Sequence, residues 1–524
     1  MAEVTLTING QKIKAEDKDT ILTAAAKNGI YIPSLCFLKD CNQAAACRIC
    51  VVEVAGMRGL VPSCVTKVRE GMEVQTENER IKKARRITLD MVCRHHRMIC
   101  DRCERYSDCE LHALCVRYGV NERDYNPYVM DPDKDKSSPY LIRDTSKCIL
   151  CQRCVSVCRE QGMDIISVLG RGREKRIAPP ISLAATDCVG CGQCVRSCPT
   201  GALTICDDTE MIRNRIRQKK PDEAVIAVLM PAVGKTIGKL FYEKDEQDHT
   251  GKVVALLRKL GFDRVYSGEL CQNIYLEAEK RELARRKAEN GTLPMVSQAC
   301  PGVEHLIRRQ YPELEKHLSG IGTLQQYSTR LARTAYAEES GLSGEKIMVV
   351  CVNSCTAAKT LPAEKTVDET MQQTSGSAQM RTVNGESAAD QMYRNLTTYE
   401  LAAMFRRACV SRFTARKVWE EQLHPDDFDP LLTEKTILAE NPQLSGMSVG
   451  ESRESGEESC TAEITGLANV KDVLEKIVIA DTQSANDTAG GESEDCIRGY
   501  ACPGGCIYGG GAPRRTSVDT VQNV

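Results

Sequence analysis

The sequence predicts a multidomain chain in which α+β domains precede a C-terminal α/β domain. Its 524 residues are enough for roughly three or four domains. Most of its 28 cysteines lie before residue 210, in C-x2-C pairs and longer runs. Such runs are typical of metal-binding modules rather than of disulfide frameworks. Beyond residue 211, continuous apolar runs alternate with charged helical stretches, which indicates an α/β domain.

Composition excludes several classes of partner and location. The formal net charge of −2 gives no strong field toward nucleic acid or an anionic membrane. The first residues lack a basic segment followed by an apolar core, so no signal peptide is expected. No run of about 18 apolar residues occurs, so no spanning helix is expected. We therefore expect a cytoplasmic protein with reduced cysteines.

Residues 1–85 begin with the pattern of a β-hairpin. Alternating residues at 4–8 and 12–14 flank Asn9-Gly10, a dipeptide that favours a tight turn between strands. Residues 20–28 then predict a short helix. Four cysteines follow with a long gap, a tight pair and a distant fourth member, at Cys36, Cys47, Cys50 and Cys64. This spacing suits a 2Fe–2S cluster on a β-grasp ferredoxin fold, with zinc as the alternative because four thiolates also bind zinc.

Residues 86–125 are predicted to form a small helical domain with a second metal site. Three cysteines follow a histidine at fixed spacing, namely His96, Cys100, Cys103 and Cys109. A lone histidine is more often structural than a ligand, but its spacing from three cysteines favours ligation here. His95 is adjacent and stays an alternative.

Residues 140–210, after a polar linker over residues 126–146, contain two nearly identical cysteine runs. Each has the C-x2-C-x2-C-x3-C pattern of the bacterial two-cluster ferredoxin, in which the fourth cysteine binds the other cluster. One 4Fe–4S cluster then takes Cys148, Cys151, Cys154 and Cys198, and the other takes Cys188, Cys191, Cys194 and Cys158. Zinc sites use paired C-x2-C motifs instead.

Residues 211–524 are predicted to form a single α/β domain. We expect strands at residues 224–230, 346–352 and 474–480, a helix at 275–290, and loops at 366–392 and 441–463.

The last cysteine pair of the chain indicates a soft-metal site. Cys502 and Cys506 flank two glycines, and three more glycines follow at 509–511. Glycine lets the backbone approach a bulky group, and thiolates favour iron–sulfur clusters, zinc or Cu(I). Two thiolates rarely complete a site, and Cys300 and Cys355 are the best further candidates.

The segments around these four cysteines resemble the three cluster-binding signatures of the iron-only (FeFe) hydrogenases. The resemblance implies an H-cluster, in which Cys300, Cys355, Cys502 and Cys506 hold a 4Fe–4S cubane and Cys506 bridges to a two-iron unit carrying CO, cyanide and a dithiolate. The N-terminal region resembles the same family and the large iron–sulfur subunit of NADH dehydrogenase. That resemblance implies a 2Fe–2S cluster in residues 1–85 and a histidine-ligated 4Fe–4S cluster at His96.

The resemblance also implies a proton path and a cofactor pocket. Glu279, Glu282 and Ser319 match the family's path, which ends here at Ala299 instead of a cysteine. Alanine carries no transferable proton, so turnover should be slow. Both carboxylates also suit an ordinary solvated helix face. Candidate pocket residues are Pro231, Ala232, Gln325 and, beside the family's lysine position at Ala358, Lys359. Asn353, Arg498 and Tyr500 depart from the family pattern.

The predicted function is reversible H2 oxidation, slow or sensory, with electrons relayed through the N-terminal clusters. Expected partners are ferredoxin or NAD(P)H- or flavin-linked redox subunits, hydrogenase maturation proteins and, for a sensor, a signalling protein. One alternative is a non-catalytic electron-transfer subunit that lacks the two-iron unit. Another is the iron–sulfur subunit of a formate or NADH dehydrogenase, which the glycine-rich loop after Cys502 disfavours.

Overall fold

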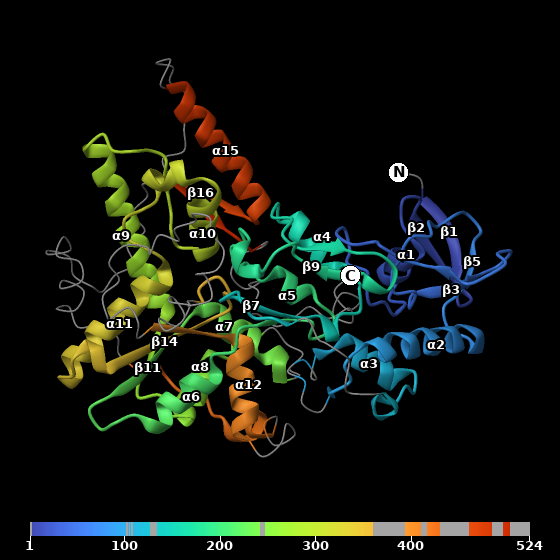
Figure 1. The fold of residues 1–524 in the computed structure, drawn as a ribbon, viewed down its shortest axis with the longest axis horizontal. Coiled ribbons are helices and arrows are strands. Elements are labelled where there is room, and N and C mark those ends of the chain that lie inside the picture. Colours follow the sequence, from blue (N-terminus) through green and yellow to red (C-terminus); the bar gives the residue numbers. More distant parts are fainter. Residues whose placement is uncertain are drawn as a thin grey trace. The chain divides into compact units, whose positions relative to one another are not determined.

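A computed structural model describes residues 3–100, 103, 105, 108–125, 134–241, 247–359, 393–409, 415, 417–429, 461–484 and 496–502. The chain divides into two compact units (Figure 1). The first comprises Met1–Cys188 and Gln193–Ile205, and the second comprises Val189–Gly192 and Cys206–Pro513. None of the described helices is long and apolar enough to cross a membrane.

The first unit begins with a five-stranded sheet and one helix. Its elements are β1 (Glu3–Ile8), β2 (Gln11–Glu16), α1 (Ile21–Lys27), β3 (Val51–Val54), β4 (Val61–Pro62) and β5 (Glu73–Gln75), and the strand order is β2-β1-β5-β3-β4. The predicted hairpin is confirmed, because Asn9 and Gly10 both take positive φ between β1 and β2. The predicted helix is also confirmed, and Thr20 opens it with a capping box to Thr23.

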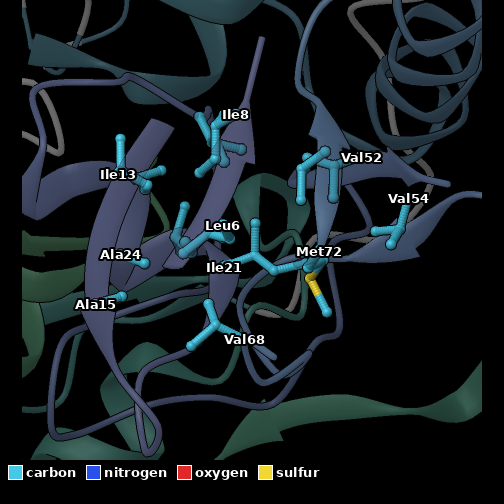
Figure 2. Close-up of a cluster of buried hydrophobic side chains, with 14 of the residues drawn as sticks. Leu6, Ile8, Ile13, Ala15, Ile21, Ala24, Val52, Val54, Val68 and Met72 are labelled. Atoms are coloured by element: carbon cyan, nitrogen blue, oxygen red, sulfur yellow. The ribbon is translucent and has the colours of Figure 1, made fainter. Parts of the chain in front are cut away.

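The core of this sheet is aliphatic, as the scarcity of aromatic residues requires (Figure 2). Leu6 and Ile8 of β1 pack with Ile21 of α1 and with Val52 of β3, and each is nearly or fully buried. The alternation of β1 and β2 places one face of each strand on this core.

The rest of the first unit carries helices and short strands around the other cysteine runs. These elements are α2 (Glu79–His95), α3 (Glu110–Arg117), β6 (Lys134–Asp135), β7 (Leu141–Asp144), α4 (Arg153–Glu160), β8 (Ser167–Leu169), β9 (Arg176–Ala178), α5 (Gln193–Ser197) and β10 (Leu203–Ile205). Strands β10, β7 and β6 form one sheet, so the predicted linker over residues 126–146 was wrong where β6 and β7 lie. One apolar cluster of the first unit contains Cys36, Cys47 and Cys151, with Cys100 and Cys109 at its edge.

The second unit is α/β, with two sheets of parallel strands. Its strands are β11 (Ala224–Leu229), β12 (Val265–Ser267), β13 (Met295–Val296), β14 (Ile347–Asn353), β15 (Tyr393–Thr397), β16 (Thr461–Thr465) and β17 (Cys496–Tyr500). Its helices are α6 (Thr209–Gln218), α7 (Pro231–Ile237), α8 (Thr250–Leu260), α9 (Gly268–Ala288), α10 (Pro301–Gln310), α11 (Leu324–Ser340), α12 (Thr398–Ala408) and α15 (Leu467–Ser484). The sheet orders are β12-β11-β14-β15 and β13-β17-β16.

Two of the three strands expected in this unit are confirmed, as β11 and β14, and both are fully buried along their length. The third prediction was wrong, because residues 474–480 lie in α15. Leu467, Val470, Leu474 and Ile477 are buried at helical spacing, which a short apolar run taken alone does not reveal. The loops expected at 366–392 and 441–460 lie outside the described residues, and residues 461–463 belong to β16.

Candidate functional site

The first four predicted ligands lie together in the loops of the β-grasp domain. Cys36 shares hydrogen bonds with Cys47 and Cys64, which lower the pKa of its thiol far below the usual range. Cys64 also bonds to Cys50 and lowers the pKa of that thiol to about 7. All four side chains are buried, so the loops bring four thiols to one place, as a 2Fe–2S cluster requires. Cys41 is half-buried, and burial raises the pKa of its thiol to about 11.

A buried arginine binds the backbone of the loop that contains Cys50. The side chain of Arg85, on α2, is fully buried and donates to the carbonyl oxygens of Ile49, Val51 and Thr76 at 3.0, 2.9 and 3.0 Å. Cys50 lies between the first two of these residues. The guanidinium fork therefore holds the ligand loop on the helix.

The second site begins at the end of α2. His96 is buried, and its Nδ1 lies 3.1 Å from the carbonyl oxygen of Lys147, so Nδ1 carries the proton and Nε2 is left for a metal. Burial lowers the pKa of His96 to about 4, which keeps the ring neutral. His95 is exposed and bonds to Met91 of its own helix. These contacts favour His96 over His95 as the ligand.

The cysteines that accompany His96 are partly buried. Cys109 is the N-cap residue of α3, and its sulfur accepts a hydrogen bond from the backbone of His112 at 3.4 Å. Burial is the largest cause that raises the pKa of Cys100, and the charges of Cys109 and Cys103 add to it.

The first ferredoxin run surrounds a cavity. Cys148, Cys151, Cys154 and Cys198 all line it, together with apolar side chains such as Ile166. These four cysteines are the set predicted for one cubane, three from the first run and one from the second, and a cavity lined by four thiols fits such a cluster.

The two ferredoxin runs share one unusual backbone pattern. Leu150 and Gln152 take left-handed φ values of 55° and 65° on either side of Cys151. Gly190 and Gly192 take φ values of 71° and 69° at the equivalent places around Cys191. Only glycine adopts this region freely, so the first repeat carries strain that the second avoids.

A buried amide connects the 2Fe–2S region with the first ferredoxin run. Asn42, in the gap between Cys36 and Cys47, donates from Nδ2 to the carbonyl oxygens of Cys36 at 2.7 Å and Cys151 at 3.1 Å. Its Oδ1 accepts from Ser156 at 3.0 Å. The 2Fe–2S loop and the first ferredoxin loop thus share one side chain.

The ligands predicted for the other ferredoxin cluster fall in both units. Cys158, Cys188 and Cys194 belong to the first unit, whereas Cys191 lies in the segment Val189–Gly192 of the second. Within the second unit, Thr356 Oγ1 donates to the carbonyl oxygen of Gly190 at 2.5 Å. His305 Nδ1 lies 3.2 Å from the carbonyl oxygen of Val189. The backbone beside Cys191 is therefore bonded to the residue after Cys355 and to α10.

Cys300 and the segment that carries Cys502 come together at the start of α10. Cys300 is its N-cap residue, and the backbone N–H of Ala501 lies 3.4 Å from its sulfur. A Cβ on Gly302 would lie 2.7 Å from the Ala501 side chain, so only glycine fits there. Cys502 follows and is buried. Cys506 and the glycines at 509–511 lie outside the described residues.

Two asparagines hold the Cys355 loop. Asn353 Oδ1 accepts the backbone N–H of Cys355 at 2.8 Å, and Asn395 Nδ2 donates to the Cys355 carbonyl oxygen at 2.8 Å. Asn353, which departs from the family pattern, therefore acts on the backbone of the loop. Asn395 lies on β15 and was missed, because nothing in the motif points to it.

Lys359 is occupied inside the protein. Its ammonium donates to Asp208 at 2.6 Å, to Glu400 at 2.8 Å and to the carbonyl oxygen of Asn395 at 3.3 Å. Three donors thus have three acceptors. Of the other expected pocket residues, Pro231 opens α7, Ala232 follows it, and Gln325 is buried with an Oε1 that has no hydrogen-bond partner among the described residues.

The residues of the expected proton path lie around α9, but their partners differ from those of a relay. Glu279 is buried, accepts a hydrogen bond from Ser297 and accepts another from Arg498 at 2.9 Å. Glu282 bonds to Arg286 at 3.0 Å and to Arg285. The arrangement gives each carboxylate a guanidinium partner.

The end of the expected path, at Ser319 and Ala299, has a buried hydroxyl but no continuous chain of hydrogen bonds among the described residues. The Ser319 hydroxyl is buried near the Tyr275 hydroxyl and makes no hydrogen bond of normal length within the described residues. Ala299 donates its backbone N–H to Ser297 Oγ at 3.2 Å. Burial raises the pKa of Tyr275 well above the usual range, and the Glu279 charge adds to this. Sequence reasoning assigned no role to Ser297, although it lies in the segment around Cys300 that resembles the first signature, and it missed Tyr275, which belongs to no signature.

Comparisons with known families agree with the three regions of the chain. Residues 1–79 match the model described as a 2Fe-2S iron-sulfur cluster binding domain, and residues 142–205 match a 4Fe-4S dicluster domain. Residues 223–510 match the C-terminal domain of the iron only hydrogenase large subunit. The chain thus carries the domains for a 2Fe–2S cluster, for 4Fe–4S clusters and for an H-cluster.

Curated relatives cover the chain nearly from end to end. It is 32% identical to the NADP-reducing hydrogenase subunit HndD of Solidesulfovibrio fructosivorans, over 98% of this chain and 89% of that protein. It is 28% identical to iron hydrogenase 1 of Clostridium pasteurianum, over 98% of this chain and 90% of that one. A shorter match, 35% identical over 38% of this chain and 24% of the relative, is to the NADPH-Fe(3+) oxidoreductase subunit alpha of Geobacter sulfurreducens.

Proposed function

This chain belongs to the iron-only hydrogenase family, and we propose that it carries out slow, reversible oxidation of H2 to two protons and two electrons. In this proposal its iron–sulfur clusters pass the electrons to an NAD(P)-linked or ferredoxin-linked partner in the cytoplasm. The similarity to HndD along both chains supports a role as one subunit of such a complex.

The hydrogen bonds at residues 189–190 carry the electron-relay part of the proposal. Thr356, next to Cys355, and His305, on the helix that Cys300 opens, hold the backbone beside Cys191. A neighbour of Cys355 and a residue on the helix that Cys300 opens are therefore bonded to the segment that contains Cys191, an expected ligand of a ferredoxin cubane. A short bonded path between two cluster sites is what a relay needs.

The C-terminal cysteines support the chemical part of the proposal. Cys300 and Cys502 come together through Ala501, with Cys355 on its own braced loop. An H-cluster bound here would supply the iron centre at which H2 is split or formed. Gln325, whose buried Oε1 lacks a partner among the described residues, fits a pocket for a polar cofactor.

The proton route supports a slow reaction. Arg498 and Ser297 occupy both oxygens of Glu279, and Ala299 offers no proton. General acid–base groups contribute typically about 10²–10⁴ in rate, so a route that ends without a donor should cost turnover on that scale.

A non-catalytic electron-transfer subunit is the second candidate. The Arg498–Glu279 ion pair favours it, because the same carboxylate that carries protons in the resemblance here fixes β17 to α9. In this reading the chain keeps the cubane and lacks the two-iron unit. A sensory role would require a signalling partner and rests on the resemblance alone.

Infrared spectroscopy separates the two candidates. The chain is produced with hydrogenase maturation proteins, and bound CO and cyanide are sought by their absorption, alongside H2 uptake. We expect both ligands and slow uptake, and we expect Ala299→Cys to raise uptake by about tenfold. Ala337→Cys, which adds a thiol at another partly buried alanine of the same apolar cluster, on α11, is the matched control. A matured protein without CO or cyanide bands would support the electron-transfer subunit.

A further inference from the structure

Helix α2 exposes large apolar side chains on the face that points away from the core. Ile87 is 52% exposed and Met91 is 62% exposed, and one helical turn separates them. On α3, which packs on α2 through Cys93 and Cys115, Val116 is 69% exposed. Ile87 and Met91, on adjacent turns of one helix, therefore offer an apolar contact surface to a partner.

The helix that carries this face has an excess of basic residues in a chain that is slightly acidic. Helix α2 holds six Lys and Arg residues against Glu79 and Asp90, whereas the whole chain has a net charge of −2. Most of these cations are paired, for example Arg94 with Asp90 and Arg80 with Glu53. Lys83 and Arg86 form no salt bridge with any described residue and are exposed beside Ile87, and the charge of Arg86 adds to the Arg94 hydrogen bond in lowering the pKa of Asp90, one turn along the helix.

The opposite face of the helix touches two cluster sites. Arg85 binds the carbonyl oxygens on both sides of Cys50, and His96 ends the helix. We call the exposed residues of this helix the α2 face; they are Lys83, Arg86, Ile87 and Met91. Only the helix itself separates this face from the 2Fe–2S loop, and the same helix ends at the His96 site.

We propose that the α2 face is the docking surface for an electron-carrier protein with an acidic surface. The inference rests on the proposed function, because it names where electrons enter or leave the relay. Unpaired cations supply long-range attraction to an acidic carrier, and Ile87 and Met91 supply the apolar centre of the contact. A docked carrier would exchange electrons with the clusters that α2 supports.

Electron-transfer kinetics test this on the full reconstituted chain. The probe is a small acidic bacterial ferredoxin reduced beforehand, and stopped-flow absorbance follows reduction of the accessory clusters. Reduced methyl viologen, a small cation that needs no protein contact, is the second donor. Because neither measurement involves H2, loss of hydrogen chemistry and loss of docking are separate outcomes.

Two variants address the two parts of the face. Lys83→Glu with Arg86→Glu should lower the second-order rate with ferredoxin about tenfold or more at low salt, and the loss should shrink at high salt. Ile87→Ser with Met91→Ser should lower it several-fold at both salt concentrations. Matched controls in the same unit are Lys12→Glu and Ile181→Ser, which should leave the rate unchanged; Lys12 is exposed and Ile181 is 55% exposed.

Three results would overturn the proposal. Equal loss with ferredoxin and viologen would show damage to the clusters rather than to docking. Unchanged ferredoxin rates in both variants would place docking elsewhere. A wild-type dimer in sedimentation that Ile87→Ser with Met91→Ser dissociates would assign the face to a second copy of the chain.

Discussion

Buried polar side chains in both units hold the backbone of loops with predicted ligands, as Asn353 and Asn395 do in the second, but two charged residues of the second unit that the sequence singled out behave differently. In the first, Arg85 and Asn42 bind the backbone of loops that carry predicted ligands. In the second, Glu279, expected on the proton path, and Lys359, expected in the cofactor pocket, are each paired with a charged side chain distant in the sequence. Spacing predicts candidate ligands, whereas the role of a buried charge depends on partners that lie outside every motif.

Removing a C-terminal ligand should give the largest change. The cysteine motifs imply about eighteen irons per reconstituted chain, and Cys300→Ser should reduce this to about fourteen by abolishing one cubane. Iron analysis with electron paramagnetic resonance measures it. Cys271→Ser, a buried thiol outside all motifs, is the control. An equal iron content in wild type and Cys300→Ser would contradict the prediction, because it would mean that Cys300 binds no cluster.

Replacing Arg85 tests the structural use of polar groups in the first unit. Arg85→Met leaves three backbone carbonyls without their donor and should destabilise the β-grasp domain by about 3–5 kcal/mol. The denaturant concentration that bleaches the 2Fe–2S absorption measures this loss. The exposed neighbour Arg86 provides the control, since Arg86→Met should change stability by less than about 0.5 kcal/mol.

Acidification should weaken the second unit through His305. Burial lowers the pKa of His305 to about 4, against an unfolded value of about 6.5. The unfolded chain takes up a proton as the pH falls through about 6.5 while the folded ring stays neutral, so stability declines toward pH 4, by about 3 kcal/mol at most.

Trp419 offers a probe for this decline, because it is the single tryptophan and is fully buried in the second unit. Its fluorescence during unfolding at several pH values should follow the predicted slope, and His305→Gln should flatten it. An identical slope in both proteins would assign the acid sensitivity to other groups.

The smallest expected effect compares the two ferredoxin repeats. Gln152→Gly removes a left-handed non-glycine residue and should stabilise the first cubane loop by about 0.5–1 kcal/mol. The reverse change, Gly192→Gln, should destabilise the equivalent loop. Cluster bleaching in denaturant measures both. If both Gln152→Gly and Gly192→Gln lower the stability, side-chain contacts rather than backbone conformation determine the stability of these loops.

The sequence predicted the first unit well because its signals are local. The AsnGly turn, the helix after Thr20 and the cysteine runs each depend on neighbouring residues. Residues 474–480 misled, because their apolar run is the buried stripe of a helix whose period shows only when Leu467 and Val470 are included. The Arg498–Glu279 pair was unpredictable in principle, since 219 positions separate its members.

The hydrogen bonds of Asn42 limit which parts of this chain can be exchanged between related proteins. Its single amide joins the loop of one motif to the loop of another, and both loops lie in one apolar cluster. The buried Arg153–Glu110 pair ties the third motif to the same block. Regions that look separable by their cysteines are therefore not exchangeable parts. Recombination or transplantation should preserve the N-terminal cluster region as one piece, because a cut between its motifs exposes buried polar groups on both fragments.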